Sequence, residues 1–508
     1  MFKDILTKET INFKDLEEIA FKIACEFANE ILKNMLEEYD EKILDSRDKV
    51  KYRNKGKETT TVKTKTGLVE YTRRKYIEKQ EDGSNRCVYL TDKLLNIKEM
   101  GQVSGGIIEL VVKNISEVSY RVCAEMISKM TGLSISGVGV WNIVQKLGEE
   151  IKQHEKEKVE VYQEDKLEPG TKETPTIYQE ADGVMIYTQG KDRKKQIEKY
   201  EKEHPNEEVP KKVRNVELKL GMTYEGWKQV ANNRYELVGK EYVAGYMTGE
   251  EMANITNANL HSKYDMKKVE LRVLNSDGGR WIKKLLVEKA IYQADSYHIK
   301  EKIGTQVKDV EDVEKLREMF WKKEYSQMIE YVETLKYKYN GEYEEIQKLE
   351  ELKKYLEKRK DSMKRYNDDE NIKKKLKTYS KKTGLKYRNM GCQESNNYCR
   401  LTRRMKHRRM SWSINGSENI AKVITTYASE SCENITKYLN IKLLPESFIE
   451  YAERYINEIE ENVKEMKKQK KNTKKSKEIY MFKQGSLDGY PQLKKILANK
   501  AISELVYR

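Results

Sequence analysis

The sequence has few cysteines and prolines and lacks long apolar runs, and each shortage excludes a class of protein. Its 6 cysteines are scattered without a C-x-x-C pair, so neither a zinc ribbon nor a disulfide scaffold is expected, and a reducing cytoplasm suits them. Only 6 of the 508 residues are proline, which argues against long disordered linkers. The apolar stretch 107–112 is interrupted by Glu109 and is far shorter than the roughly 20 residues that span a bilayer, so no membrane partner is expected.

Motifs for common cofactors are missing as well. The sequence contains neither a P-loop GxxxxGK(S/T) nor a GxGxxG, so binding of ATP or of a dinucleotide is not expected. The histidines His154, His204, His261 and His407 show no metal-ligand spacing. The N-terminus carries acidic residues near its start and does not have the pattern of a secretory signal peptide.

The charge balance is basic. Lysine and arginine number 99 and aspartate and glutamate 84, which gives a formal net charge of +15 at pH 7. An excess of positive charge favours a polyanionic partner such as nucleic acid. A chain rich in lysine and tyrosine can also result from coding bias alone, so the charge by itself leaves both interpretations open.

Periodicity and composition divide the chain into eight segments. Apolar residues at helical spacing, such as Ile19, Ile23 and Phe27, predict a helix near the start, whereas TTTVKTKTGLVEYTRRK alternates like a β-hairpin. The expected order is an N-terminal helical segment (1–57), a small β-hairpin module (58–95), a helix-turn-helix-like DNA-binding segment (96–150), a linker (151–175), the first part of an α/β core (176–299), a helical insertion (300–390), a further core helix (391–425) and a basic helical C-terminal region (426–508).

The segment SYRVCAEMISKMTGLSISGVGVWNIVQKL has the outline of a helix-turn-helix. A helix is expected over 118–130, followed by a turn at 133–136 and a second helix that carries Trp141 and Val144. An ordinary pair of antiparallel helices has the same outline, so both interpretations stand at this point.

The core segment alternates between strands and helices. Strands are expected at 176–188, 213–224, 235–246, 269–274 and 290–294, and helices at 250–261 and 280–289. Three strands, a helix, a strand, a helix and a strand form the running order of a ribonuclease-H-like α/β domain.

Three acidic residues in this region could hold divalent cations. Asp182 lies inside an apolar strand, Asp277 follows a strand at its carboxyl end, and Glu394 begins a strongly basic helix. Carboxylates from separate elements that meet at one sheet edge can hold the two metal ions that phosphodiester chemistry uses. Taken singly, each aspartate could instead belong to an Asp-Gly turn, and Glu394 could be an ordinary first-turn glutamate.

Further polar residues accompany these acids. Asp295 and His298 in ADSYHIK could face the same pocket, although a capping aspartate beside a structural histidine is the simpler interpretation. The basic side chains suited to DNA phosphate are Arg403, Arg404 and Lys406 after Glu394, and Lys467, Lys468, Lys470 and Lys471 in a lysine-rich run that could equally be a solvated tail.

Four motifs together resemble a known family. EADG at Asp182, SDGGRWIK at Asp277, ADSYHIK at Asp295 and RRMKHRRMSWS after Glu394 resemble the ISLre-type bacterial insertion-sequence transposases. These are grouped with a UPF-class family and are similar in layout to the Mutator-like DDE transposases. The resemblance extends from about residue 60 to about residue 425, with SDGG here where family members often have GDGA.

The resemblance implies a catalytic site and a reaction. It implies a ribonuclease-H-like core with a helical insertion, catalytic and metal-binding residues Asp182, Asp277 and Glu394, and His298 nearby with Asp295 as an accessory. Glu418 in INGSENIAKV is a rival for the third acid. With two Mg²⁺ (or Mn²⁺) ions, such an enzyme cleaves the ends of an insertion sequence and joins the 3′-hydroxyl to target DNA.

The implied partners are double-stranded DNA, as terminal inverted repeats and as target, and further copies of the chain in a homo-oligomer. The implied location is the cytoplasm, at the nucleoid. Two alternatives remain: a transposase-derived DNA-binding protein without catalysis, and a metal-dependent nuclease without strand transfer.

Overall fold

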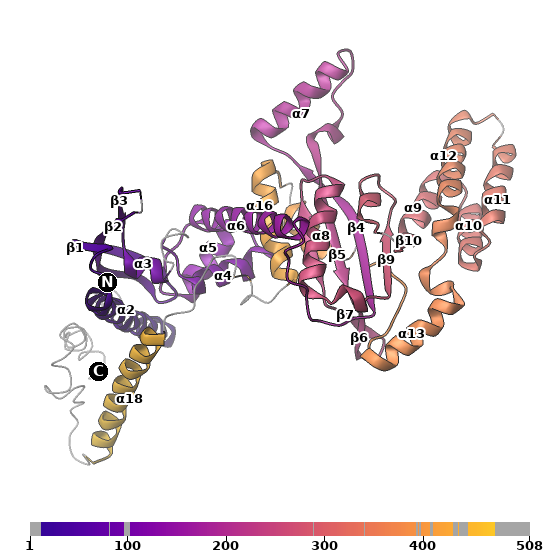
Figure 1. Cartoon of the computed structure of the whole chain (residues 1–508). Coiled ribbons are helices and arrows are strands. Elements are labelled where there is room, and N and C mark those ends of the chain that lie inside the picture. Colours follow the sequence, from indigo (N-terminus) through magenta and orange to yellow (C-terminus); the bar gives the residue numbers. More distant parts are fainter. Residues whose placement is uncertain are drawn as a thin grey trace. The chain divides into compact units, whose positions relative to one another are not determined.

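The computed structural model describes residues 12–472 except 81, 96–101, 288, 340, 393–394, 396–397, 407–409, 430–434 and 436–445. The chain forms two compact units (Figure 1). The first comprises Met1–Ile143 with Thr436–Arg508, and the second comprises Val144–Ile435. No helix in the described ranges combines the length and the apolarity needed to cross a membrane.

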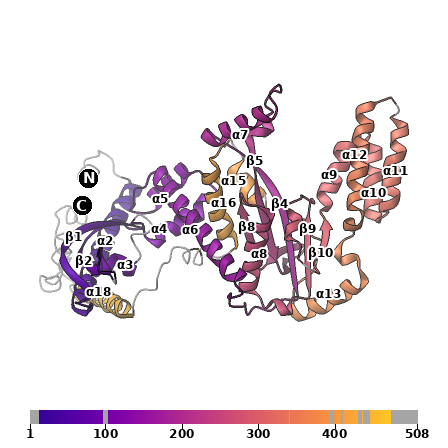
Figure 2. The ribbon, with the colours of Figure 1, turned by 45° about the horizontal axis from the view of Figure 1, so that its top comes forward.

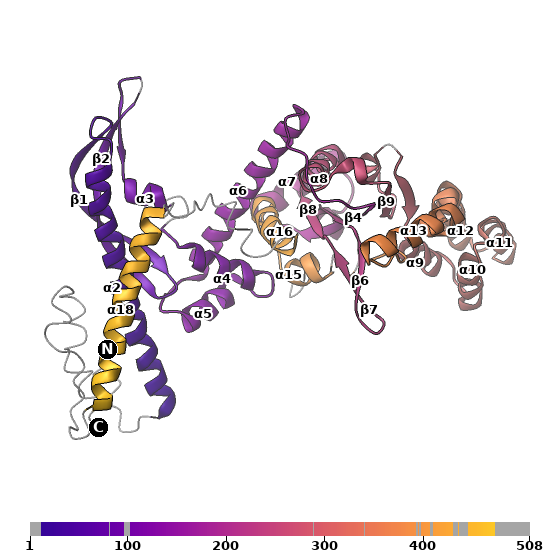
Figure 3. The ribbon, with the colours of Figure 1, turned by 60° about the horizontal axis from the view of Figure 1, so that its bottom comes forward.

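The first unit is built on the helix α2 (Phe13–Ser46) and an antiparallel sheet of three strands. Asn12 caps α2 in a capping box with Asp15, which satisfies backbone donors at the start of the helix. The helix packs on β2, and the helix α18 lies along α2, as Figure 3 shows. The elements of this sheet and the C-terminal helix are β1 (Tyr52–Thr64), β2 (Gly67–Lys79), β3 (Asn85–Val88) and α18 (Glu446–Asn472).

Four more helices follow the sheet: α3 (Leu90–Leu95), α4 (Gly105–Ile115), α5 (Tyr120–Met130) and α6 (Gly137–Gln163). The two helices expected around the turn at 133–136 are α5 and α6, and Ser119 caps α5 by accepting a hydrogen bond from the Val122 amide at 3.3 Å. Where a linker was expected from residue 151, α6 continues to Gln163. Its Glu, Lys and Gln residues are good helix formers, so a charged segment need not be a linker.

The second unit centres on a mixed sheet with the strand order β10-β9-β4-β5-β8 (Figure 2). The strand β4 is parallel to β9, and β9 is parallel to β10, whereas β5 runs antiparallel to both β4 and β8. The strands are β4 (Thr176–Tyr187), β5 (Asn215–Tyr224), β8 (Glu241–Gly245), β9 (Leu271–Ser276) and β10 (Ile291–Ala294), and the helices beside them are α8 (Gly249–Lys263) and α16 (Ile414–Ser429).

Two sequence-based expectations for this region were wrong. The segment 235–246 is two strands: β7 (Arg234–Val238) pairs with β6 (Gly226–Ala231) in a separate ribbon, and β8 follows after Gly239 at φ +71°. In the described part of 280–289, where a helix was expected, the chain forms a 3₁₀ helix at Ile282–Leu285, whose side chains Ile282 and Leu285 are buried in the core. The helix α7 (Gly190–Glu203), between β4 and β5, was not anticipated.

The expected helical insertion begins directly after the sheet. Four helices, α9 (Ser296–Gln306), α10 (Val310–Lys322), α11 (Tyr325–Lys338) and α12 (Tyr343–Arg359), share one apolar core that includes Ile303, Leu316, Val332 and Leu352. The helix α13 (Glu370–Thr383) follows, and the chain then returns to the sheet.

Candidate active site

Three aspartates occupy one register position on three neighbouring parallel strands: Asp182 lies inside β4, whereas Asp277 and Asp295 directly follow the ends of β9 and β10. Ala181 of β4 pairs with Ser276 of β9, and Ser276 pairs with Ala294 of β10. The next residue along each strand is therefore Asp182, Asp277 or Asp295. Since neighbouring strands lie about 4.8 Å apart and residues in register share a face, the fold brings the two predicted aspartates Asp182 and Asp277 together.

The carboxylates of Asp182 and Asp277 are half-buried and held locally. The Gly183 amide donates to Oδ1 of Asp182 at 2.7 Å, and the Gly279 amide donates to Oδ1 of Asp277 at 2.9 Å. Gly278, between these last two residues, has a φ of +87°, a conformation that glycine adopts without strain. The backbone after each aspartate thus fixes the direction of its side chain.

The helical insertion contacts the loop that carries Asp277. Arg359, at the end of α12, donates from Nη2 and Nε to the carbonyl oxygen of Asp277 at 2.8 and 3.3 Å. Its guanidinium also stacks on the ring of Tyr355, 3.9 Å from the centroid. A pocket of about 240 Å³ opens here, lined by Asp277, His298, Glu301, Lys302, Thr305, Tyr355 and Arg359.

Asp295 and His298 face each other at the start of α9. Asp295 is at the N-cap position, but its side chain makes no capping hydrogen bond. Its Oδ2 lies 3.8 Å from Nε2 of His298, whose Nδ1 lies 3.5 Å from Oε2 of Glu301. The simple capping role considered for Asp295 therefore does not describe this side chain, which is buried and directed along the sheet edge.

Glu394 lies outside the described residues, but the structure describes Gly391 and Cys392 shortly before it. The backbone amides of Gly391 and Cys392 each donate to Oε1 of Glu180 at 3.4 Å. Glu180 precedes Asp182 by two residues on β4 and shares its face of the sheet. The segment that leads to Glu394 thus reaches the strand that carries the first aspartate.

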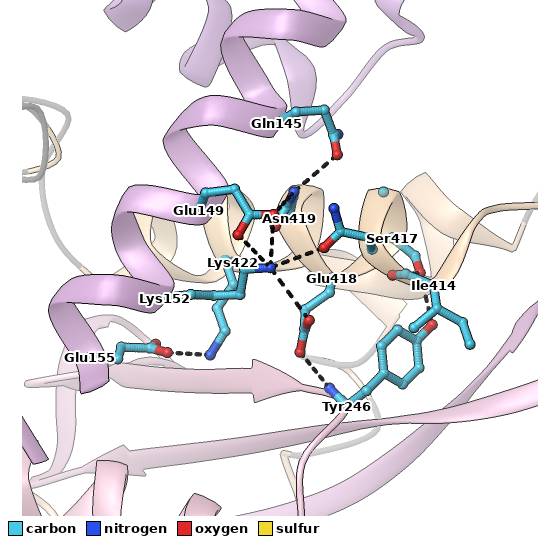
Figure 4. Close-up of polar contacts among 12 residues, drawn as sticks. Gln145, Glu149, Lys152, Glu155, Tyr246, Ile414, Ser417, Glu418, Asn419 and Lys422 are labelled. Atoms are coloured by element: carbon cyan, nitrogen blue, oxygen red, sulfur yellow. Dashed lines mark hydrogen bonds and ion pairs between the residues drawn. The ribbon is translucent and has the colours of Figure 1, made fainter. Parts of the chain in front are cut away.

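The rival acid Glu418 lies on α16, and its contacts are structural (Figure 4). Its Oε1 accepts a hydrogen bond from the Tyr246 amide at 2.9 Å, and its Oε2 lies 3.7 Å from Nζ of Lys152 on α6. Glu418 therefore holds α16 to the end of β8 and to α6. Since β8 is separated from β4 by β5, this carboxylate stands two strands, or roughly 10 Å, from the strand of Asp182.

The surrounding contacts show that this seam between α6 and α16 is tightly packed. Asn419 is fully buried and donates from Nδ2 to Gln145 at 3.0 Å and to Glu149 at 2.9 Å. A Cβ atom at Gly148 would lie 2.5 Å from Cβ of Asn419, so the helices approach closely at this glycine. The side chain of Lys422, also buried, pairs with Glu155.

The basic residues expected to bind DNA differ in their exposure. Arg403 and Lys406 are exposed, whereas Arg404 is buried with its guanidinium 5.1 Å from the ring centroid of Trp412. Arg404 thus points inward, away from any surface that DNA could reach. The backbones of Lys467, Lys468, Lys470 and Lys471 belong to the last turns of α18, and their side chains lie outside the described part of the chain.

The described part of the chain offers no complete set of metal ligands. No group of three or more His, Cys, Asp or Glu side chains is gathered there closely enough to hold an ion. Asp182 and Asp277 supply two carboxylates at one edge, and the third predicted ligand, Glu394, is outside the described residues.

A second row of polar residues, two positions before the aspartates on the same three strands, was not predicted from the sequence. Glu180, Asn275 and Gln293 stand two residues before Asp182, Asp277 and Asp295 respectively. The signal was present, because the three strands carry the sequences EAD, NSD and QAD at this position: a polar residue, a small residue and an aspartate in each case. Arg359, by contrast, had no distinguishing pattern in a helix rich in charge.

The fold defines a mixed α/β protein with two carboxylates, Asp182 and Asp277, in register on adjacent parallel strands. The chain belongs to the uncharacterised protein family UPF0236, whose family model matches residues 6–438. No curated protein matches the sequence.

Proposed function

We propose that this protein is a DNA transposase of the DDE type, which cleaves the ends of an insertion sequence and joins the freed 3′-hydroxyl to target DNA. The observation that carries the proposal is the common register of Asp182, inside β4, and Asp277, directly after the adjacent parallel strand β9. Two carboxylates so placed are the core of a site that hydrolyses and transfers phosphodiesters.

The topology supports a ribonuclease-H-like core. The first three strands of the sheet in chain order, β4, β5 and β8, are antiparallel neighbours, and the next two, β9 and β10, join the other side in parallel. The helical insertion leaves the sheet after β10, before the segment of the third acid. This is the arrangement that the resemblance to DDE transposases implies.

The donor chemistry fits magnesium or manganese. Asp182 and Asp277 offer only carboxylate oxygens, the ligands that Mg²⁺ prefers, and Glu394 would complete the set. When bound, two such ions would activate the attacking oxygen and stabilise the leaving one. The hydrogen bonds from Gly183 and Gly279 orient the two aspartates in advance, so little rearrangement is needed when the ions bind.

The other predicted residues would serve DNA and its phosphates. His298, held between Asp295 and Glu301, lines the same pocket as Asp277 and would contact a phosphate near the reacting bond. Arg403 and Lys406, with the lysines of α18, would contact the DNA backbone. Binding two element ends at once would favour a homo-oligomer, acting in the cytoplasm at the nucleoid.

The test is cleavage and joining of DNA by the full-length protein. The substrate carries the sequences that flank the coding region of the element, and Mg²⁺ or Mn²⁺ is supplied. Asp182→Asn and Asp277→Asn should each slow cleavage by about 100-fold or more, which corresponds to a loss of roughly 3 kcal/mol of transition-state stabilisation. Asp165→Asn is the matched control, because Asp165 is exposed and has a φ of 58° that asparagine also adopts.

Three results would change the proposal. Cleavage by both aspartate variants at the wild-type rate would remove these residues from the site. Specific DNA binding without cleavage under either metal would favour the DNA-binding protein without catalysis. Cleavage without any joined product would favour the nuclease.

A further inference from the structure

The helix α7 contributes no buried side chain to the second unit. None of its 14 residues is buried. In Figures 1 and 2 the helix stands clear of the sheet, between the strands β4 and β5 that it connects. Most helices in proteins gain their stability from an apolar face that packs on the core. Packing therefore does not explain why the chain places a helix here.

The base of α7 is nevertheless firmly attached to β4. Nε of Arg193 donates to the carbonyl oxygen of Thr188 at 2.9 Å, and its guanidinium lies 4.9 Å from the ring centroid of Tyr187. The amide and the hydroxyl of Thr188 donate to the carbonyl oxygen of Arg214 at 2.9 and 2.8 Å. The 3₁₀ helix Lys211–Arg214, which leads into β5, thereby lies beside α7. These contacts give the two segments a defined place at the end of β4.

Asp192 is the only acidic residue in the first half of α7, and it is engaged by another helix. Its Oδ2 accepts a hydrogen bond from the Ile414 amide at 2.8 Å, at the start of α16. An acidic group at the start of a helix is favourable because of the helix dipole. Asp192 therefore has a structural role, which joins α7 to α16.

Positive side chains surround this base. Residues 190–195 have the sequence GKDRKK, and the adjacent 3₁₀ helix has the sequence KKVR. The exposed lysines of the two segments, here called the α7-base lysines, are Lys191, Lys194, Lys195, Lys211 and Lys212. None of them forms an ion pair with a carboxylate in the described part of the chain, whereas Lys199 in the second half of α7 lies 3.9 Å from Glu203. These five charges are therefore available to a ligand.

The positive charge of this region acts on a neighbouring tyrosine. A hydrogen bond and the charge of Arg214 hold the pKa of Tyr187 below its ordinary value, and the charges of Arg193 and Lys211 act in the same direction. Cations in the first turn of a helix also oppose the helix dipole, so Lys191 does not stabilise α7. Like charges that gather in this way repel one another, and a bound polyanion would relieve the repulsion.

The α7-base lysines lie along the strand that carries the first aspartate. Tyr187, at the base of α7, follows Asp182 by five residues on β4, a rise of roughly 17 Å. Consecutive phosphates of one DNA strand are about 3.4 Å apart along the helix axis, so this rise corresponds to about five base pairs. A duplex that is held at Asp182 and extends along β4 would therefore reach the α7-base lysines.

We propose that the α7-base lysines bind phosphates of duplex DNA about five base pairs from the bond that is cleaved at Asp182 and Asp277. This inference rests on the proposed function for the position of that bond, but DNA binding by the lysines can be measured without cleavage. An ammonium group contacts phosphate as a point charge and reads no bases. The contact would fix where the duplex lies, without selecting its sequence.

The binding arm of the test measures how the affinity for a labelled duplex of arbitrary sequence falls with salt, by fluorescence anisotropy. The proteins are wild type, Lys194→Gln with Lys195→Gln, Lys211→Gln with Lys212→Gln, and the control Lys199→Gln with Lys202→Gln, whose lysines are exposed in the second half of α7. Each lysine that contacts a phosphate contributes about 1 to the slope of log affinity against log salt, so each base variant should lose up to about 2. The control should keep a slope near that of wild type.

The variants should fold, because the lysines are exposed and glutamine is a good helix former. The two base variants also lie on different elements, so each provides a check on the other. A circular dichroism melt that matches wild type confirms folding before the affinities are compared.

The cleavage arm varies the length of duplex on each side of the cleaved bond in turn, with about 3 or about 15 base pairs, lengths that stop short of the α7-base lysines or pass them. With wild-type protein, KM should be about tenfold lower for the longer duplex on one side. Both base variants should lose most of that difference at unchanged kcat, since they remove binding that substrate and transition state share. The control variant should retain it.

The outcomes separate this proposal from the proposed function. If the slopes change as expected and wild-type protein cleaves no DNA, the lysines bind DNA and the proposed function fails. If the base variants keep the wild-type slope, or the control loses as much as they do, the proposal is wrong. Equal KM for both lengths on both sides would also overturn it. Weaker binding of vesicles that contain phosphatidylserine, with an unchanged DNA slope, would assign the lysines to a membrane surface instead.

Discussion

At the scale of single residues, Arg359 joins the helical insertion to the loop that holds Asp277. Its guanidinium donates two hydrogen bonds to one carbonyl oxygen and stacks on Tyr355. The carbonyl oxygen belongs to Asp277, which carries the second carboxylate. A movement of α12 would therefore be transmitted to that carboxylate through the side chain of Arg359. The insertion is thereby part of the mechanical support of the candidate site.

Arg359 provides a prediction at this scale. Arg359→Ala should lower the rate of DNA cleavage by about tenfold, a loss of roughly 1.4 kcal/mol, because the Asp277 loop loses both donors. The cleavage rate of Arg359→Lys should lie between those of the wild type and Arg359→Ala, since lysine can donate to the carbonyl oxygen but cannot stack on Tyr355 as a planar guanidinium does. Single-turnover cleavage measures both, with exposed Arg234→Ala as the control. Equal rates for all three variants would contradict the role of Arg359.

At the scale of elements, buried ion pairs bind α2 and α3 to the sheet of the first unit. Asp40 on α2 accepts from the Arg74 amide at 3.0 Å, from Nη1 of Arg74 at 2.8 Å and from the Thr91 hydroxyl at 2.6 Å. Asp92 on α3 accepts from the Tyr71 hydroxyl at 2.8 Å and forms a pair with Arg73 at 2.7 Å. The adjacent arginines Arg73 and Arg74 of β2 thus pair with aspartates on two different helices, α3 and α2.

Removing one partner of such a pair should be costly. Asp40→Ala leaves Arg74 buried without its main acceptor and should lower the unfolding free energy of the first unit by about 3–5 kcal/mol. Glu41→Ala is the matched control: Glu41 also pairs with Arg74, at 2.6 Å, but its side chain is half exposed, so a loss of about 1 kcal/mol or less is expected. Hydrogen exchange of β2 peptides across a urea series measures both. A similar loss for the two variants would show that burial does not decide the strength of these pairs.

At the scale of the whole molecule, the excess of positive charge has a measurable consequence if the protein binds DNA as proposed. The net charge is +15, and lysines and arginines that contact phosphates release counterions. The affinity for a duplex of arbitrary sequence should therefore fall steeply with salt, by about 10³-fold or more between 50 and 200 mM if six or more phosphates are contacted. Fluorescence anisotropy with a labelled duplex measures the slope.

The effect on DNA affinity of where the positive charge lies can be separated from the effect of the net charge. Changing Lys467, Lys468, Lys470 and Lys471 to glutamine should make the salt slope shallower. Removing the same number of charges from exposed Lys374, Lys375, Lys377 and Lys381 of α13 should change it less. Equal slopes for the two quadruple variants would show that net charge, rather than the lysines of α18, sets the affinity.

The sequence predicted much of the sheet, and its errors have physical causes. Strands 176–188 and 213–224 differ from β4 and β5 by at most two residues at either end, since both segments are rich in strand formers such as Val, Ile, Thr and Tyr. The segment 235–246 was predicted as one strand, but it is divided at Gly239: β7 pairs with β6 in a local hairpin, and β8 joins the main sheet. The segment 280–289 was predicted as a helix but forms a 3₁₀ helix at Ile282–Leu285, because the apolar pair Ile282 and Leu285, three residues apart, suits either kind of helix.

The sequence alone determined the chemical groups: an aspartate inside one strand and another after a strand end, a basic balance, and an insertion of strong helix formers between the sheet and its last acidic segment. Only the tertiary structure decided which of these groups meet. Register placed Asp295 in line with Asp182 and Asp277, and a hydrogen bond to the Tyr246 backbone tied Glu418 to the end of β8. Local propensity acts over a few residues, whereas strand order and the docking of a returning segment depend on contacts between residues far apart in the chain, as between Glu180 and Cys392.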